Sequence, residues 1–374
     1  MQAHYVANIE WTLLEVKIPK NIARTPKAME QVFAALHSTY HYDMKILEAW
    51  WDGVVQPWTS LEIVGQSGSV SFYARVFSRF RNLLEAAIYA QYPGAEIREA
   101  PDYIGNLPER LPNEKYDLFG SNFILRTDDG YPIRTYEYFE DIEDERRLDP
   151  IAAITEAMSK LKEGETIWLQ ILVSPVLDEW KKKAEMLINK LIGAKEKPKA
   201  SLFGEFMAGF SNVFSGEPAV PEKKQPEDQP NKIRFMTQGQ RDVVQAIEEK
   251  IAKIGFRSNI RFVYIDKRDS FSKANVSAVI GALAQFNTQN LNALRIDGKT
   301  LTKGKFPMKA RRALMRKVTL YDDYRSRDFA VRSSVFNTEE LATLYHYPTL
   351  VVEAPKLQRI EAKKKEPPAN LPIE

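Results

Sequence analysis

The sequence predicts an α+β fold with two ferredoxin-like βαββαβ units, the second of which is split by a long helical insertion. Residues 59–99 show the spacing of a hairpin, then a helix, then a strand, and a strand and a helix precede them. Residues 121–295 repeat this order of elements once an insertion at about 176–255 is removed. The repeat is one of element order, without a clear repeat of residues.

The first predicted unit covers residues 1–100. Apolar and polar residues alternate over Ile9–Ile18, which indicates a strand, and Pro19 ends it. Thr25 can cap a helix that begins with Pro26, because proline suits the first helical position. The predicted buried stripe of this helix consists of Met29, Val32, Phe33 and Leu36.

A hairpin, a helix and a fourth strand complete this unit. Gln66-Ser67-Gly68 separates two alternating stretches and is typical of a hairpin turn. Helical spacing begins at Arg79, Pro93-Gly94 ends the helix, and residues 95–98 can form the last strand. The apolar positions of the hairpin are Leu61, Ile63, Val70, Phe72, Ala74 and Val76, and those of the helix are Phe80, Leu83, Leu84, Ala87 and Ile88.

A connector is predicted at residues 101–120, because several residues there break regular structure. The second unit, residues 121–295, begins after it. Its first predicted elements are strands at Asn122–Arg126 and Ile133–Phe139, joined by Asp128-Asp129-Gly130, then a helix from Asp149 and a strand at Thr166–Val173.

The helical insertion begins with a helix at Val176–Ile192 and ends with one at Thr237–Ile254. Residues 194–232 between them are rich in proline, lysine and glutamate, so we expect them to be flexible. An amphipathic helix at the tip of this segment is expected to contact a membrane or a partner protein through Phe203, Phe206, Phe210 and Phe214. The unit closes with a strand at Ile260–Ile265, a helix at Phe271–Phe286 and a strand near Leu294.

The composition excludes several classes of function. A chain of 374 residues can form about two domains with cores of their own. The absence of cysteine excludes disulfides, thiolate zinc sites and cysteine nucleophiles. The sequence has no apolar run of the length that spans a bilayer, and its first residues lack the pattern of a signal peptide.

Three motifs with catalytic potential each have a simpler interpretation. Gly298-Lys299-Thr300 is similar to the end of a P-loop, but that motif requires glycine where Ala293 stands. His37 and His41 could share a metal ion, yet no third ligand follows at a recognised spacing. The acidic run at residues 137–149 is typical of a solvated loop. We therefore expect no enzymatic activity, no metal, no cofactor and no small-molecule substrate.

A basic segment follows the second unit, within the C-terminal region 296–374. Residues 295–332 contain twelve Lys and Arg against four Asp, a net charge of +8, whereas the whole chain carries +3. Such a segment can attract the phosphates of nucleic acid or of lipid headgroups, with Tyr321, Tyr324 and Phe329 available to stack on bases. The alternative is a solvated surface with tyrosines packed beneath it. The predicted phosphate contacts are Lys305, Lys309, Arg311, Arg312, Arg316 and Lys317.

A resemblance to a known family covers most of the chain in several blocks. LLEVKIPKNIARTPKAMEQVFAALH at residues 13–37, QPWTSLEIV at 56–64, FRNLLEAAIYAQYPGAEI at 80–97 and VFNTEELATLYHYP at 335–348 are its main blocks. They resemble the N-terminal, membrane-proximal region of bacterial conjugation or type IV secretion-like ATPases of the coupling-protein type. The sequence departs from those ATPases because it has no GxxxxGK[ST] motif and ends at Glu374, about where their ATPase core would begin.

The resemblance implies a non-enzymatic accessory or docking module of a translocating ATPase, peripheral at the cytoplasmic face of the membrane. Its partner would be a separately encoded P-loop ATPase, with DNA or anionic lipid as further partners, and a homo-oligomer is compatible with the ring-forming motors. The alternative is a free-standing nucleic-acid-binding protein that uses residues 295–332. The expected docking surface lies within residues 335–355, at Asn337, Thr338, Glu339, Glu340, Leu341, Leu344, Tyr345 and His346.

Overall fold

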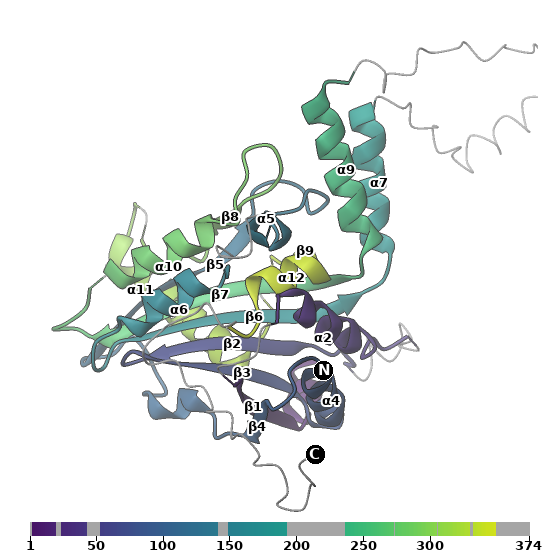
Figure 1. Ribbon diagram of the computed structural model, residues 1–374. Coiled ribbons are helices and arrows are strands. Elements are labelled where there is room, and N and C mark those ends of the chain that lie inside the picture. The colour runs from purple at the N-terminus through teal and green to yellow at the C-terminus, as the bar shows by residue number, and fades with distance from the viewer. Residues whose placement is uncertain are drawn as a thin grey trace, which may run out of the picture.

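One antiparallel sheet of nine strands organises the described part of the chain (Figure 1). The structure is a computed structural model, and it describes residues 2–19, 24–42, 53–140, 149–192, 236–272, 274–304, 306–329 and 332–348. Helices and strands are both abundant, which confirms the predicted α+β class.

The strands are β1 (Trp11–Lys17), β2 (Thr59–Gln66), β3 (Ser69–Phe77), β4 (Glu96–Glu99), β5 (Tyr116–Leu125), β6 (Thr166–Val176), β7 (Gly255–Lys267), β8 (Leu294–Ile296) and β9 (Ser334–Asn337). The α-helices are α1 (Gln2–Ala7), α2 (Lys27–His37), α4 (Arg81–Gln91), α5 (Glu137–Glu140), α6 (Ala152–Ser159), α7 (Glu179–Ile192), α9 (Gln238–Ala252), α10 (Ala274–Ala284), α11 (Lys309–Ser326) and α12 (Thr338–Leu344). Two short 3-10 helices are η1 (Ser78–Phe80) and η2 (Tyr103–Asn106).

The first four strands lie in the order β4-β1-β3-β2, and each neighbouring pair is antiparallel. The predicted hairpin is formed by β2 and β3. Ser67 and Gly68 between these strands have positive φ angles of 50° and 81°, as a two-residue hairpin turn of the favoured twist requires. Alternate residues of β3 are buried, so the period of two in the sequence sets which face meets the core.

The strands of the second half lie in the order β6-β7-β5-β8, again with antiparallel neighbours. The two halves meet where β2 pairs with β6, with Leu61 opposite Ile171 and Ile63 opposite Leu169. All four of these side chains belong to one buried cluster, so the halves share both a sheet and a core. The predicted insertion contains α7 and α9, which form a hairpin that rises away from the sheet (Figure 1).

Two predictions for residues 101–139 are wrong. β5 begins at Tyr116, inside the predicted connector 101–120, and η2 occupies part of the remainder. Ile133–Phe139 does not form a strand but leads into α5. The backbone N–H groups of Ile133 and Tyr136 donate to the side chains of Glu340 and Thr343, each at 2.9 Å. The apolar alternation implied that a neighbouring strand would accept these backbone hydrogen bonds, but side chains of α12 accept them instead.

The two faces of the sheet are covered differently. Helices α2, α4, α6, α10 and α12 contribute to the larger core, and Figure 1 shows α6, α10 and α12 in front of the sheet. A smaller core on the other face joins strand residues such as Trp168 and Val263 to α11 and η2. The second face thus carries the basic segment predicted from the sequence.

A candidate functional site on the exposed half of a basic helix

The C-terminal half of α11 is anchored to the sheet. Leu320, Tyr321 and Tyr324 are buried, and the ring of Tyr324 stacks on Trp168 with the centroids 5.0 Å apart. Gly120 in β5 permits this close approach, because a Cβ there would lie 2.8 Å from Leu320 Cδ2 and 2.3 Å from a backbone oxygen of β7. The absence of a side chain at residue 120 therefore lets the helix lie directly on the strands.

Arg327 locks the end of this helix into the sheet. It has a left-handed backbone conformation with φ 57°, and its side chain is almost fully buried. The guanidinium donates from Nε to Glu62 Oε1 at 2.7 Å and from Nη1 to Asp102 Oδ2 at 2.8 Å. The Arg327 carbonyl oxygen accepts a hydrogen bond from Trp58 Nε1 at 3.0 Å. Arg327 thus connects the end of α11 with β2, with the start of η2 and with Trp58, the residue that precedes β2.

Electrostatic interactions around Arg327 favour the charged forms of its partners Glu62 and Asp102. Burial by itself raises the pKa of the Glu62 carboxyl, but the Arg327 charge and the hydrogen bonds to the carboxylate hold that pKa below its ordinary value. The same guanidinium lowers the pKa of Asp102 against the opposing effect of burial. Burial lowers the pKa of nearby Arg75 to about 10. The Arg327 guanidinium and the two carboxylates stabilise the attachment of α11, and their charges are engaged with one another.

The N-terminal half of α11 has the opposite character, because its side chains are exposed. Lys309, Arg311 and Arg312 are all exposed, and none of them forms an ion pair within the part of the chain that the structure describes. Large apolar side chains lie among these cations: Phe306 is 83% exposed, Met308 59%, Leu314 50%, Met315 60% and Val318 41%. We call this set, at residues 306–318, the α11 patch.

The structure separates the six predicted phosphate contacts into three groups. Lys309, Arg311 and Arg312 belong to the α11 patch, whereas Lys305 lies outside the described residues. Arg316 Nη1 donates to the Leu301 and Lys303 carbonyl oxygens at 3.0 and 2.8 Å. Lys317 Nζ is 2.5 Å from Asp117 Oδ1. Arg316 therefore binds the loop before α11, and Lys317 binds β5. Both side chains stabilise the fold and are already engaged.

The predicted stacking of Tyr321, Tyr324 and Phe329 on bases is also corrected. Tyr321 and Tyr324 are fully buried, and their hydroxyl groups bond the Pro108 carbonyl oxygen and Tyr103. Phe329 is half-buried between Arg257 and the ring of Trp58. All three rings therefore pack against other parts of the protein and do not present free faces to bases.

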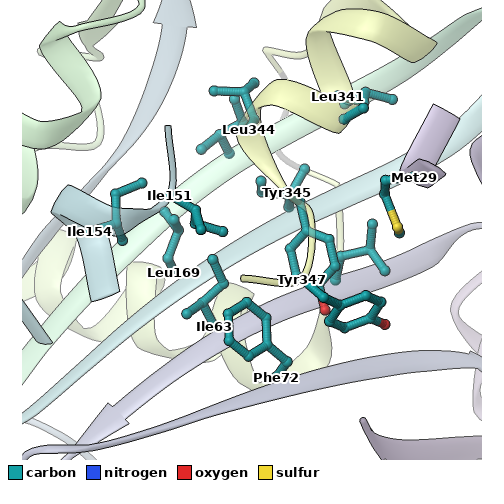
Figure 2. Packing of buried hydrophobic residues seen from close by; sticks show 14 of the residues in the cluster. Met29, Ile63, Phe72, Ile151, Ile154, Leu169, Leu341, Leu344, Tyr345 and Tyr347 are labelled. Carbon is teal, nitrogen blue, oxygen red and sulfur yellow. The ribbon is translucent and has the colours of Figure 1, made fainter. Parts of the chain in front are cut away.

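The predicted docking surface is wrong for the residues that the structure describes, because they lie inside the molecule. The apolar face of α12 packs into the larger core beside Phe72, Leu169 and Ile154 (Figure 2). The Glu339 side chain is 12% exposed, and the other seven predicted docking residues are at most 5% exposed. They are Asn337, Thr338, Glu340, Leu341, Leu344, Tyr345 and His346. Residues 349–355 lie outside the described part of the chain.

Polar groups at this position are satisfied internally. The Asn337 side chain accepts from Glu340 N–H at 2.8 Å, and the Glu340 side chain accepts from Asn337 N–H at 3.0 Å, which forms a capping box for α12. Lys250 Nζ lies 2.9 Å from Glu340 Oε2, with both side chains fully buried. Burial raises the pKa of Glu340 despite the attraction of Lys250. His346 bonds Asp149 at 2.7 Å. This segment therefore closes the core.

The other candidates from the sequence that the structure describes lie in separate places and serve local structure. Gly298-Lys299-Thr300 forms a turn after β8, in which Thr300 accepts from Asn122 N–H at 3.0 Å. His37 bonds the Val176 carbonyl oxygen at 3.0 Å. Among the described residues, no group of three His, Asp or Glu is arranged to hold a metal ion, and no helix could cross a bilayer. The Phe-rich helix, with Phe203, Phe206, Phe210 and Phe214, and residues 141–148 of the acidic run lie outside the described residues.

Sequence reasoning missed the apolar part of the α11 patch. Leu314 and Met315 precede Val318 by four and three positions, and this spacing could have been recognised as one side of a helix. That signal is weak, because Leu320 and Tyr321 on the opposite side are also apolar. The buried attachment through Arg327 had no local signal, because its partner Glu62 lies 265 positions away.

Comparison with known sequences identifies the family. No curated protein matches the chain. A family model described as a domain of unknown function (DUF8128) matches residues 3–359, which is nearly the whole chain. The protein therefore belongs to the DUF8128 family.

Proposed function

We propose that the chain is a non-enzymatic accessory module of a type IV secretion or conjugation-like translocating ATPase, held at the cytoplasmic face of the membrane. The sequence blocks that resemble the membrane-proximal region of coupling-protein ATPases support this role, and the partner would be a separately encoded P-loop ATPase. The structural observation that carries the proposal is the α11 patch, where a firmly anchored helix presents three exposed cations that form no ion pair with the described residues.

The anchoring matters to this proposal. Cations on a mobile tail can attract phosphate, but they do not orient the body that carries them. Here Arg327 and the buried tyrosines attach the other end of the same helix to the sheet. A phosphate-bearing partner of the patch would therefore hold the whole sheet in one orientation.

The finer fold belongs to the same proposal: each half of the sheet is a ferredoxin-like unit, and the two units are joined edge to edge. Support comes from the strand order, which is β4-β1-β3-β2 in the first half and β8-β5-β7-β6 in the second. These orders are identical when each half is numbered from its own first strand. The helices that follow the first and third strands of each half also correspond.

Affinity purification from gently solubilised host membranes, followed by mass spectrometry, tests the function. We expect a P-loop ATPase to co-purify and the chain to be found in the membrane fraction. Replacing the three exposed cations of the patch by glutamine, as Lys309→Gln, Arg311→Gln and Arg312→Gln, should move the chain to the soluble fraction. The matched control is Lys182→Gln, Lys183→Gln and Lys190→Gln on α7, which removes the same charge from other exposed positions.

The second candidate function is free-standing nucleic-acid binding through residues 295–332, and the same exposed cations favour it. Recovery of nucleic acid from the soluble fraction, with no ATPase in the purified material, would support this alternative and contradict the accessory role. Phosphate contacts weaken steeply with salt, so the salt slope of the binding constant measures how many of the three cations take part.

A further inference from the structure

We infer that the α11 patch enters the headgroup region of an anionic lipid bilayer, with its apolar side chains reaching the acyl boundary. This inference rests on the proposed function, because it names the partner of the same three cations. It also goes further, because it assigns a role to the exposed apolar residues, which neither phosphate attraction nor an accessory role requires.

The apolar residues of the patch are concentrated to an unusual degree. Eleven large apolar side chains are strongly exposed among the described residues, and five of them lie between Phe306 and Val318. Single exposed apolar residues are normal on a protein surface, whereas a cluster of them marks a contact site. Phe306 is the most exposed of all eleven, at 83%.

The arrangement on the helix places both kinds of side chain on the outer side. Leu320, Tyr321 and Tyr324 define the inner side because they pack on the sheet. At 100° per residue, Arg311, Met315 and Val318 project away from these three residues, with Leu314 and Arg312 on either flank. Around the helix, Arg311 lies between Val318 and Met315, and Arg312 lies beyond Met315, so the cations and the apolar side chains share the outer side. Basic side chains combined with large exposed apolar side chains are typical of helices that lie in the plane of a membrane interface.

The α11 patch contains no acidic residue, and the first acidic residues after it are Asp322 and Asp323. No acidic residue occurs between Arg295 and Arg332 except Asp297, Asp322, Asp323 and Asp328, and none of these lies within residues 306–318. Contact with an anionic surface is therefore confined to the first turns of α11. In the remaining turns, the inner side of α11 packs on the sheet and on η2.

A bilayer matches this surface better than nucleic acid does. DNA phosphates would pair with the three cations but would leave Leu314, Met315 and Val318 against water. Base stacking requires free aromatic faces, but Tyr321 and Tyr324 are buried, and four of the five exposed apolar side chains of the patch are not aromatic. A lipid interface instead takes the cations at the phosphates and the aliphatic side chains just below them.

Co-sedimentation with vesicles tests the inference on the purified full chain. We expect binding to vesicles of phosphatidylcholine mixed with phosphatidylserine and little binding to phosphatidylcholine alone. Removal of the three cations as glutamine variants should weaken binding about a hundredfold, because each basic residue near an anionic surface contributes about fivefold. The matched α7 triple variant should change binding by less than about threefold.

A second variant separates lipid from nucleic acid. Leu314→Ser, Met315→Ser and Val318→Ser keep every charge of the patch, and all three sites are exposed, so the fold should be retained. We expect roughly tenfold weaker binding to the anionic vesicles and unchanged binding to a DNA duplex. If the serine variant binds vesicles and DNA as well as the wild type does, and DNA is bound more tightly than vesicles, the inference is overturned in favour of nucleic acid.

Depth of entry can be read directly, because the chain contains no cysteine. An environment-sensitive dye on Met315→Cys should shift its emission to the blue with anionic vesicles, and the same dye on Leu191→Cys of α7 should not. Absence of a shift at residue 315, or an equal shift at 191, would contradict entry of the patch. If vesicles do not bind but the P-loop ATPase still co-purifies, the lipid contact is wrong and the accessory role stands.

Discussion

At the scale of single residues, the attachment of α11 depends on one buried cation. Arg327 reaches Glu62 and Asp102 from a left-handed backbone position at the end of the helix. The Tyr103 hydroxyl group donates a further hydrogen bond to Glu62 at 2.8 Å. A buried carboxylate is tolerated when it is paired and hydrogen-bonded, and both conditions are met here.

Replacing Arg327 by methionine should therefore destabilise the protein strongly. The change leaves Glu62 buried without its counter-charge, which typically costs about 3–5 kcal/mol in the free energy of unfolding. Urea unfolding measures this difference. The control is Arg311→Met, the same chemical change at an exposed site that forms no ion pair with any residue the structure describes, for which we expect less than about 0.5 kcal/mol. Similar small effects at both positions would show that the buried pair is unimportant.

The pH dependence of this difference gives a second prediction. Glu62 has a pKa below its ordinary value of 4.5 in the folded state, so its stabilising contribution is complete above that value and is lost as the pH falls through the lowered pKa. We expect the gap in unfolding free energy between the wild type and Arg327→Met to narrow as the pH falls below 4.5. Unfolding curves across that range provide the test, and a gap independent of pH would contradict it.

At the scale of elements, the same capping motif occurs in two different environments. The capping box of α12 pairs Asn337 with Glu340 in the core, whereas that of α9 pairs Thr237 with Gln240 at the exposed end of the helical hairpin. Loss of an exposed cap lets water bond the freed N–H groups. Loss of a buried cap leaves those groups without a partner, which costs more.

This contrast predicts unequal effects of two alanine substitutions. Asn337→Ala should lower the free energy of unfolding by about 2 kcal/mol or more, because Glu340 N–H and the Lys250 carbonyl oxygen, which accepts from Asn337 Nδ2, both lose a partner. Thr237→Ala should cost about 1 kcal/mol or less. Chemical denaturation of the two variants measures both values, and an equal cost would argue against the burial of α12.

Elements differ in how far their sequences reveal them. The hairpin of β2 and β3 is recognisable, because alternation and the turn residues depend on neighbours in the chain. For α11 the apolar residues lie on both the inner and the outer side of the helix, so the segment appears only as a basic run. Ile133–Phe139 has strand-like alternation, but its backbone meets α12 instead of a strand.

At the scale of the whole molecule, the pairing of β2 with β6 makes the two halves depend on each other. Ile63 of the first half and Leu169 of the second lie opposite one another and are both fully buried. Separating the halves would expose this shared core to water. We therefore expect the sheet to unfold as one cooperative unit.

Two single-cysteine variants can test this cooperativity. Ala90→Cys on α4 and Ala278→Cys on α10 are matched exposed alanine positions, one in each half. A fluorescent label at either site should report the same urea midpoint and the same slope. Two separate transitions would show that the halves are independent domains despite their common sheet.

The sequence by itself determined the α+β class, the hairpin, most of the helices and the position of the basic segment. These features follow from periodicity, turn residues and charge, which act over a few positions in the chain. Only the tertiary structure decided that residues 337–346 close the core, that Arg316 and Lys317 are engaged, and that Lys309, Arg311 and Arg312 remain exposed. The physical reason is that burial and pairing depend on contacts between distant segments, such as the 265 positions that separate Glu62 from Arg327.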